Sequence, residues 1–416
     1  MSVLKCSNCR QVAASNHPAD RMAATEPKTV VSLLSGATEA IFAMGLEQQL
    51  VGCSHECDYP AAAVAALPTC SLALVDHTDT AAAIDAQVKA LSDTGEPMYK
   101  LEAATVAALA PDVIIVQDSC RICAVSPSAL AGAGPALLDC EVVTLRPRTL
   151  QDVMGDIVSV GAALGHRQLA ADYASGLHER LDRLPPAPQL GGAAVKVAVL
   201  EWVDPLMSCG YWIPELVAAA GCRCILAGAG EHTGYVTLPE LLAAAPDIVI
   251  IASCGFDVRR CASELVAASA QSRQAVAALA GSIGGAGKVW VADGNRFFNR
   301  SGPGVVESAV IVGQAARGGE AVPGEPDLRG TAGFVSLEEA LEMEGTTLTA
   351  FGGDAAEGAA AVAAQQPAAA VEEAAAAKAS ALAGAQEVVA ALRRGDVAAA
   401  HALSAVAALM PVETYR

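Results

Sequence analysis

The chain has 416 residues, of which 53% are hydrophobic and 17% are charged, and this composition excludes a chain that is disordered throughout. Its formal net charge of −19 disfavours nucleic acid and anionic lipid as partners, because both are negatively charged. No apolar stretch reaches the roughly 20 residues that a bilayer crossing needs, so we expect no membrane insertion.

Residues 1–27 are predicted to form a flexible N-terminal segment. Charged residues, Asn and Pro interrupt this segment, so it lacks the continuous apolar core of a secretory signal. We therefore predict a cytoplasmic or organellar location.

The 13 cysteines are an odd number, which together with this location predicts mostly buried, reduced thiols rather than a disulfide framework. Two C-x-x-C pairs occur, Cys6 with Cys9 and Cys120 with Cys123. Together they offer four zinc ligands, but their wide separation in the sequence makes zinc the weaker interpretation.

An N-terminal αβ lobe is predicted over residues 28–147. The β-branched run at residues 29–34 predicts a strand, and the small residues after it lead into a helix with Thr38 as its N-cap. A second strand, QLVGC at residues 49–53, ends in the polar loop of residues 54–60.

A C-terminal αβ lobe on the same plan is predicted over residues 194–316. Its first strand begins at Lys196, and its first helix starts near Pro214 and ends at Gly221. APDVIIVQDSC at residues 110–120 and APDIVIIASCG at residues 245–255 repeat one pattern, and such unbroken Val and Ile runs are typical of parallel strands buried on both faces. The predicted fold class is therefore α/β, with two Rossmann-like αβ lobes in series.

The remaining segments are predicted from their periodicity and composition. Residues 148–184 carry apolar side chains at helical intervals, which predicts a single long α-helix that bridges the lobes. Residues 317–333 are predicted to be a linker, and residues 334–416 an Ala-rich extension that is partly helical or disordered. Within it, Ser336 and Glu339 form a capping-box pattern. We expect deletion of residues 334–416 to leave ligand affinity intact.

The loops that follow the predicted strands carry the candidate site. Open parallel sheets bind ligands beyond the carboxyl ends of their strands, so these loops are expected to line a cleft between the lobes. Aromatic residues are only 4% of the chain, and their concentration in these loops favours a broad, flat ligand; packing in the lobe cores is the alternative. The candidate ligand-binding residues are Ser35, Thr38, His55, Asp58, Tyr59, Gln117, Trp202, Asp204, Tyr211, Trp212, Phe256, Asp257, Phe298, Asn299 and Arg300.

These loops contain no recognisable catalytic motif. G-x-S-x-G, the P-loop and H-E-x-x-H are all absent from the sequence, and the loop carboxylates show no acid–base spacing. For Asp58 and Asp204, each near a Pro, loop capping and turn formation are the alternative roles. We therefore predict a non-enzymatic binding protein, with no catalytic residue, no catalytic cofactor and no assigned metal ligand.

Four motifs in this order resemble the cobalamin-binding members of the iron-siderophore and vitamin B12 substrate-binding family, over about residues 28–316. They are VSLLSGATEAIFAMGLEQQLVGCSHECDYP, LEWVDPLMSCGYWIPELVAAAG, CGFD and FFNRSGPGVVES. The resemblance implies two Rossmann-like lobes joined by one rigid helix, a corrinoid such as cobalamin held between them, and an ABC-type importer as partner. Cys53, Tyr211 and Gly304 depart from the family pattern.

Alternatives to a cobalamin protein remain open at the level of sequence. One is a thiol-based metal carrier or redox protein that uses Cys53, Cys57, Cys120 and Cys254. Others are a binder of siderophore or heme-type chelates and a corrinoid-modifying enzyme. Given the predicted location, an intracellular cobalamin-handling protein is the alternative partner to an importer.

Overall fold

A computed structural model describes residues 27–118, 130 and 140–352. These residues form two compact units. The first contains residues 27–77, 87–183 and 300–306 within the described ranges, and the second contains residues 78–86, 184–299 and 307–352. The predicted α/β fold is confirmed, but residues 78–86 and 300–306 each belong to the opposite unit from the one that chain order predicts.

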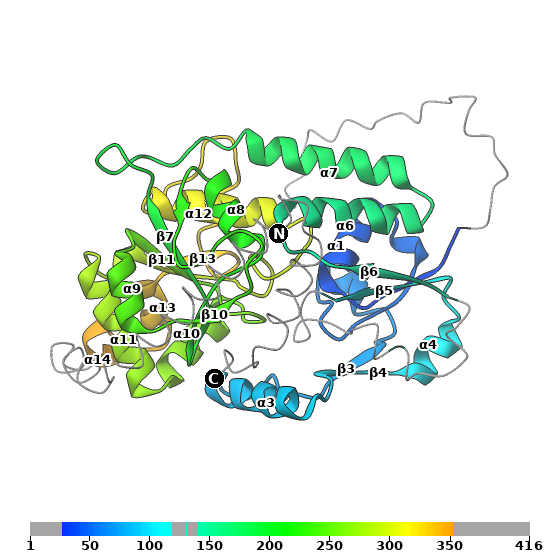
Figure 1. Cartoon of the computed structure of the whole chain (residues 1–416), viewed down its shortest axis with the longest axis horizontal. Coiled ribbons are helices and arrows are strands. Elements are labelled where there is room, and N and C mark those ends of the chain that lie inside the picture. Colours follow the sequence, from blue (N-terminus) through cyan, green and yellow to red (C-terminus); the bar gives the residue numbers. More distant parts are fainter. Residues whose placement is uncertain (1–26, 119–129, 131–139, 353–416) are drawn as a thin grey trace, which may run out of the picture. The chain divides into compact units, whose positions relative to one another are not determined.

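The first unit is built on a four-stranded parallel sheet with the order β2-β1-β5-β6, of which Figure 1 labels β5 and β6. Its central strands are completely buried, as the Val and Ile runs predict. The strands are β1 (Val30–Ser32), β2 (Leu50–Cys53), β5 (Val113–Gln117) and β6 (Glu141–Leu145), with β3 (Ser71–Ala73) and β4 (Tyr99–Leu101) as a separate antiparallel pair. The helices are α1 (Ser35–Ala43), η2 (Glu47–Gln49), α2 (Ala61–Val64), α4 (Ala103–Leu109), α6 (Leu150–Ala163) and α7 (Arg167–Asp182), and α3 (Ala81–Thr94) is shared with the second unit.

The first helix begins earlier than the sequence predicts. α1 starts at Ser35, and Leu34 is its N-cap residue without a side-chain hydrogen bond. Thr38 lies inside the helix and is fully buried, so its predicted role as N-cap is wrong. Its hydroxyl instead donates to Ser32 Oγ at 2.9 Å, which ties α1 to the end of β1.

Two helices, α6 and α7, replace the single bridging helix predicted over residues 148–184. They lie side by side (Figure 1). Gly165 takes a left-handed φ of +85°, which ends the first helix. Gly161 allows the close contact, because a Cβ there would lie 2.3 Å from Ala170 Cβ. Helical periodicity continues through both helices, so the chain reversal between them leaves little trace in the hydrophobic pattern.

The second unit contains a sheet with the order β10-β8-β7-β11-β12-β13, and β9 also pairs with β7. β7, β9, β11 and β12 pair in parallel, whereas β8, β10 and β13 are antiparallel to their neighbours. The strands are β7 (Lys196–Val203), β8 (Leu206–Ser208), β9 (Arg223–Cys224), β10 (Gly234–Tyr235), β11 (Ile248–Ile251), β12 (Val289–Ala292) and β13 (Phe334–Ser336). The helices are α8 (Ile213–Ala219), α9 (Leu238–Ala244), α10 (Val258–Ala267), α11 (Ala270–Ser282), η4 (Ala286–Lys288), α13 (Leu337–Met343) and α14 (Leu348–Gly352), together with most of α12 (Val305–Ala316).

The repeated Ala-Pro-Asp runs adopt the same local structure in both units. Ala110 ends α4 and Ala245 ends α9, both in the left-handed conformation. The aspartate two residues later accepts a 2.7 Å hydrogen bond from the neighbouring strand, Asp112 from the Thr29 N–H and Asp247 from the Lys196 N–H. Each run then becomes a buried parallel strand, β5 or β11. The predicted internal repeat is therefore present in the structure.

Residues 334–352 are an integral part of the second unit, which differs from the predicted extension. β13 pairs with β12 in the main sheet, and Phe334 and Leu337 are fully buried. The capping box is confirmed, because Ser336 Oγ accepts from the Glu339 N–H and the Glu339 carboxylate accepts from the Ser336 N–H. The expectation that deletion from residue 334 is harmless is withdrawn, since it would remove a strand from the sheet.

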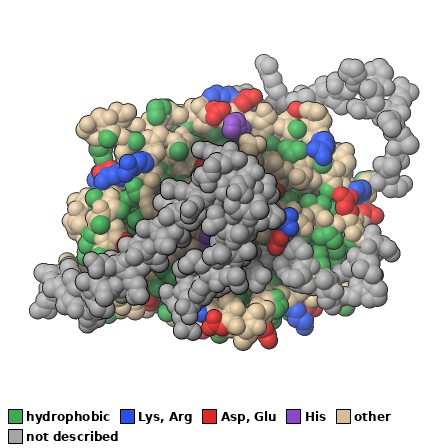
Figure 2. All heavy atoms as spheres, in the orientation of Figure 1, with side chains coloured by type: hydrophobic (Ala, Val, Ile, Leu, Met, Phe, Trp, Pro, Cys, Tyr) green, Lys and Arg blue, Asp and Glu red, His purple; other side chains and the backbone are tan. Residues whose placement is uncertain are grey.

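Several predictions concern residues outside the described ranges. These are the two C-x-x-C pairs, residues 1–26 of the N-terminal segment predicted to be flexible, and residues 353–416 of the predicted Ala-rich extension. All nine described cysteines are free thiols. In the part of the chain that the structure describes, no helix is long and apolar enough to span a membrane. On the face shown in Figure 2, Lys and Arg side chains are scattered among Asp and Glu.

Candidate functional site

A pocket of about 310 Å³ opens in the first unit where β2 ends. Its wall combines small apolar side chains from α2 and the residues after it with polar side chains from the loop that follows β2. The lining residues are Cys53, Ser54, His55, Cys57, Asp58, Ala61, Val64, Ala65, Leu67 and Thr69. This volume is at the lower end of the range for small-molecule sites, so the pocket is large enough for a small ligand or for part of a larger one.

His55 is held in a defined orientation at this pocket. Its Nδ1 lies 2.8 Å from Ser71 Oγ, and its ring packs against Tyr99 with centroids 5.0 Å apart. Nε2 is buried and makes no hydrogen bond, although it lies 3.3 Å from Glu56 Oε1. An imidazole side chain held in this way is of a type that accepts hydrogen bonds or coordinates a metal carried by a ligand.

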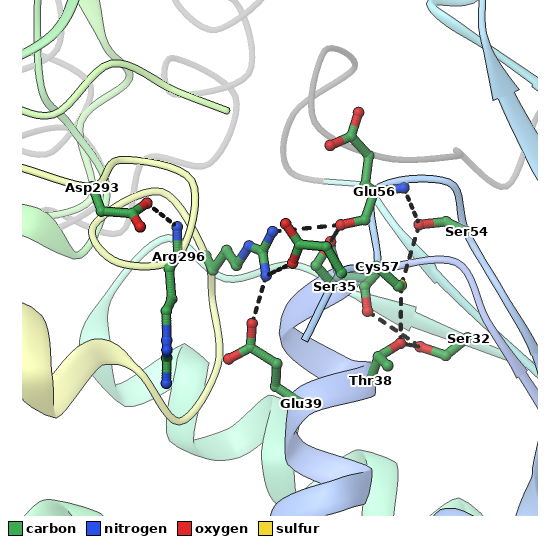
Figure 3. A network of polar contacts seen from close by, with 12 residues as sticks. Ser32, Ser35, Thr38, Glu39, Ser54, Glu56, Cys57, Asp293 and Arg296 are labelled. Carbon is green, nitrogen blue, oxygen red and sulfur yellow. Dashed lines mark hydrogen bonds and ion pairs between the residues drawn. The ribbon is translucent and has the colours of Figure 1, made fainter. Parts of the chain in front are cut away.

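Cys57 belongs to a hydrogen-bonded chain behind the pocket (Figure 3). Its Sγ lies 3.1 Å from Thr38 Oγ1, whose hydroxyl donates to Ser32, and Ser32 donates in turn to the Leu34 carbonyl. Since each hydroxyl has a single proton, the Cys57 thiol is the donor toward Thr38 in this chain. This chain gives Thr38, a predicted ligand contact, hydrogen-bond partners within the protein.

Arg300 supplies a buried positive charge beside the pocket residue Asp58. Nη1 lies 2.7 Å from Glu39 Oε1 and 2.7 Å from Asp58 Oδ1; the Arg300 and Glu39 side chains are each 7% exposed, and Asp58 is 51% exposed. Burial alone would lower the pKa of Arg300, but the two carboxylates reverse this and hold it above its usual value. The guanidinium stays charged and fixes the position of Asp58.

A glycine allows the segment that carries Arg300 to reach the first unit. A Cβ on Gly36 would lie 2.3 Å from the Ser301 carbonyl oxygen, so only glycine permits this approach of two backbones. On the same side of α1, Ser35 Oγ donates to the Glu56 carbonyl at 2.8 Å. Residues 300–306 therefore dock on α1, which explains why Arg300 belongs to the first unit.

The other predicted residues of the first unit are more scattered. Tyr59 is 39% exposed and precedes Pro60 in a cis peptide bond. Gln117 ends β5 and is buried. Of the candidates in this unit, His55 and Asp58 lie in the pocket wall. Arg300 binds Asp58, and Ser35 donates to the carbonyl of Glu56, so both stabilise the loop of residues 54–60.

In the second unit, Trp202 and Phe256 pack together with residues 78–86. The two rings have centroids 5.0 Å apart, and Trp202 Nε1 lies 3.2 Å from the carbonyl oxygens of both Ala81 and Asp204. Arg260 stacks over Phe256 at 5.1 Å and donates to the carbonyls of Thr78 and Asp79. Residues 78–86 thus occupy one side of this aromatic pair.

Tyr211, Trp212 and Phe298 form a second aromatic group. Tyr211 and Trp212 are stacked with centroids 6.0 Å apart, and Trp212 Nε1 donates to the Phe298 carbonyl at 2.9 Å. Phe298 is fully buried and Trp212 is almost so. Both side chains are therefore packed in the interior of the second unit.

Three polar candidates in the second unit hold local structure. Asp204 is buried and accepts hydrogen bonds from the Ser269 N–H, Ser269 Oγ and Ser272 Oγ at the start of α11. Asp257 is the N-cap of α10 and accepts from the Arg260 N–H. Asn299 Nδ2 donates to the carbonyls of Ala252 and Gly294. These contacts agree with the capping alternative for Asp204.

The sequence analysis missed Glu39, Glu56 and Cys57 as members of the polar network. Glu39 and Arg300 are 261 residues apart, so no local pattern connects them. Glu39 and Arg300 each lie in one of the four quoted motifs. A glutamate on the buried face of a predicted helix is the feature that indicates a charged partner, because buried carboxylates are rarely unpaired. Among the described residues, no group of three or more His, Cys, Asp or Glu side chains is arranged to hold a metal ion.

No protein-family model and no curated protein matches this chain. Solved structures do match. A periplasmic heme binding protein from Pseudomonas aeruginosa is 19% identical, with 74% of this chain and 98% of that chain covered and a TM-score of 0.51. The periplasmic heme-binding protein BhuT, in complex with two hemes, is 19% identical over 70% of this chain and 99% of that chain, with a TM-score of 0.50. The periplasmic vitamin B12 binding protein BtuF of Vibrio cholerae is 18% identical over 70% of this chain and 97% of that chain, with a TM-score of 0.47.

The chain therefore has the fold of the periplasmic binding proteins. Within that fold, the two structures with TM-scores of 0.50 or more are heme-binding proteins by title.

These comparisons contradict the predicted cytoplasmic or organellar location. Both structures are titled as periplasmic proteins. The prediction depended on the composition of one N-terminal segment. It is wrong, and the intracellular cobalamin-handling partner that depended on it is withdrawn.

Proposed function

We propose that this chain is a non-enzymatic binding protein for a planar tetrapyrrole-type ligand with a central metal, and that a corrinoid such as cobalamin is the first candidate. The observation that carries the proposal is the pocket at the end of β2, whose wall contains His55 in a fixed orientation and the half-exposed carboxylate of Asp58. The fold and the four sequence motifs support the same class of ligand. An ABC-type importer is the proposed partner, because the resemblance is to substrate-binding proteins.

The charge of the pocket favours a corrinoid over heme. Asp58 is half exposed at the pocket, and the neighbouring Glu56 side chain is 36% exposed. The nearby cation, Arg300, is already bound by Glu39 and Asp58. Carboxylates accept hydrogen bonds from the amide groups around a corrin ring, whereas they repel the propionates of heme.

Heme is the second candidate because both structures with the higher TM-scores are heme-binding proteins. An imidazole nitrogen such as His55 Nε2 also suits heme iron. The two candidates differ in peripheral groups, so they predict opposite effects of the acidic side chains.

Parallel titrations of the purified chain with cyanocobalamin and with ferric heme test the proposal by calorimetry and absorbance. We expect saturable cobalamin binding with Kd in the micromolar range or tighter, equivalent to about −8 kcal/mol or better, and weaker heme binding. The reverse order would establish the second candidate. If neither ligand saturates the protein, the proposal is wrong.

Two variants test the site. His55→Ala is expected to weaken binding at least tenfold, and the exposed His178 on α7 provides a matched control, His178→Ala, that leaves binding unchanged. Asp58→Asn removes a charge with little change in shape. The affinity of this variant for a corrinoid is expected to be unchanged or lower than that of the wild type, and its affinity for heme is expected to be higher.

The aromatic residues Trp202 and Trp212 remain proposed ligand contacts. Trp→Ala at a packed ligand face typically costs a few kcal/mol of binding free energy. If Trp202→Ala lowers thermal stability and leaves affinity unchanged, then its contacts with Phe256 and Ala81 are structural only.

A further inference from the structure

Two cysteines of the second unit meet at one edge of β7. Cys209 Sγ and Cys224 Sγ are 3.8 Å apart, although the residues are 15 positions apart in the sequence. Both are free thiols; Cys209 is 1% exposed and Cys224 is half-buried. The ligand-binding proposal makes no use of this pair.

The topology of the sheet explains the encounter. β9 pairs with the first residues of β7, with Cys224 opposite Val197. β8 runs antiparallel along the later part of β7, and just beyond β8 the Cys209 N–H donates to the Val199 carbonyl at 3.0 Å. The partners on β7 are two residues apart, which is about 6.6 Å along a strand. Disulfide-bonded residues usually have Cα atoms about 4.4–6.8 Å apart, so the backbone spacing is compatible with a bond.

We propose that Cys209 and Cys224 are the site of a reversible disulfide bond, formed by exchange with a small-molecule disulfide such as oxidised glutathione. The Cys224 thiolate attacks one sulfur of that disulfide, and the first glutathione thiolate leaves. The Cys209 sulfur then attacks Cys224 Sγ in the mixed disulfide, and the second glutathione leaves. The protein loses two protons and two electrons, and the small disulfide gains them as two thiols.

The difference in exposure assigns these roles. Cys224 is the more accessible sulfur and therefore meets the reagent, while the buried Cys209 resolves the mixed disulfide. The thiol–thiol hydrogen bond also lowers the pKa of Cys224, which favours its thiolate. Cys222, two residues away, has its thiol directed at the Ala220 carbonyl at 3.9 Å, so it serves as a local control.

The bond would restrain the loop that carries the aromatic candidates. Tyr211 follows Cys209 by two residues, has a left-handed φ of +53°, and its N–H donates to the Glu231 carbonyl at 2.7 Å. Trp212 comes next and stacks on Tyr211. A covalent link at Cys209 therefore reduces the freedom of the loop beneath both rings, whichever ligand the protein binds.

The test uses the full chain equilibrated with mixtures of reduced and oxidised glutathione. Free thiols are alkylated, and the digested protein is mapped by mass spectrometry. We expect a peptide pair linked through Cys209 and Cys224, lighter by two hydrogen atoms and lost on reduction. Backbone hydrogen exchange at residues 209–213 is expected to slow in the oxidised protein.

Cys209→Ser and Cys224→Ser should each abolish the linked peptide and the change in exchange, whereas Cys222→Ser should retain both. The wild-type peptide map decides the question even if a variant folds poorly. Full alkylation of Cys209 and Cys224 under oxidising conditions, or pairing of Cys224 with Cys222, overturns the proposal.

Discussion

Arg300 and Glu39 form a charged pair that is almost fully withdrawn from water in the first unit. Removing one partner of such a pair leaves the other charge buried and uncompensated, which costs far more than the pair itself contributes. Asp58, the third member, is half exposed, so solvent screens its share of the interaction. Glu39 and Asp58 therefore contribute differently to stability although both lie 2.7 Å from Arg300 Nη1.

Arg300→Met is expected to lower the free energy of unfolding by about 3–5 kcal/mol, because the Glu39 carboxylate stays buried without a cation. Asp58→Asn is expected to cost less than about 1 kcal/mol. Urea unfolding of both variants measures the difference. Adding Glu39→Gln to Arg300→Met should restore part of the loss, and a double variant that is less stable still would contradict this account.

Elements of this protein begin and end on residues that also hold neighbouring elements together. Asp204 follows β7 and binds the first residues of α11. β13 comes late in the chain, yet it forms an edge strand of the sheet whose first strand in the chain is β7. Substitutions at helix caps and at the edge strand are therefore expected to lower the free energy of unfolding while ligand affinity stays unchanged.

Asp204→Ala removes the acceptor of three hydrogen bonds at the start of α11. We expect a loss of about 1–3 kcal/mol in the free energy of unfolding, since buried donors are left unpaired. Calorimetric titration with cyanocobalamin should show unchanged affinity. Asp257→Ala, at the N-cap of α10, is a matched control with an expected cost of about 1 kcal/mol. Lost affinity with normal stability in Asp204→Ala would restore its predicted role as a ligand contact.

Leu337→Ala is expected to destabilise the second unit by about 2–5 kcal/mol, because Leu337 is fully buried beside β13. Met343→Ala, at the other end of α13, removes a side chain that is 36% exposed and should cost less than about 1 kcal/mol. Thermal unfolding of both variants makes the comparison. Equal, small effects would mean that α13 is not part of the cooperative unit.

The carboxyl groups of this protein make the free energy of unfolding depend on pH in two opposite ways, because some have raised pKa values and others have lowered ones. Burial and the neighbouring Asp152 raise the pKa of Asp156 on α6 from 3.8 to about 7. Hydrogen bonds from Thr29 lower the pKa of Asp112, and those from Ser336 outweigh burial to lower that of Glu339. Asp156 binds its proton more tightly in the folded state, so its contribution to stability is lost as pH rises from about 4 to about 7. The other two stabilise the fold above pH 4 and lose this effect as pH falls.

We therefore expect the free energy of unfolding to decline between pH 5 and pH 8. Asp156→Asn should abolish much of this decline and be more stable than the wild type at pH 8, by about 1–3 kcal/mol. Urea unfolding at a series of pH values measures both curves. If the two curves run parallel from pH 5 to pH 8, Asp156 is not the group responsible.

The sequence by itself determined the α/β class, the repeated Ala-Pro-Asp strands and the Ser336 capping box. These features depend on neighbours within a few residues, where hydrophobic period, β-branching and cap chemistry are local. His55 and Asp58 were also predicted, because polar residues that follow a buried strand lie at the edge where such sheets bind ligands.

Tertiary structure alone decided the chain reversal between α6 and α7, the edge strand β13 and the Arg300–Glu39 pair. It also places Cys209 beside Cys224 and Asp204 beside the donor groups at the start of α11. Each of these joins residues that are distant in the chain or fixes the direction of a segment. Such contacts are selected by packing and by the need to pair buried polar groups, and neither is encoded within a short stretch of sequence.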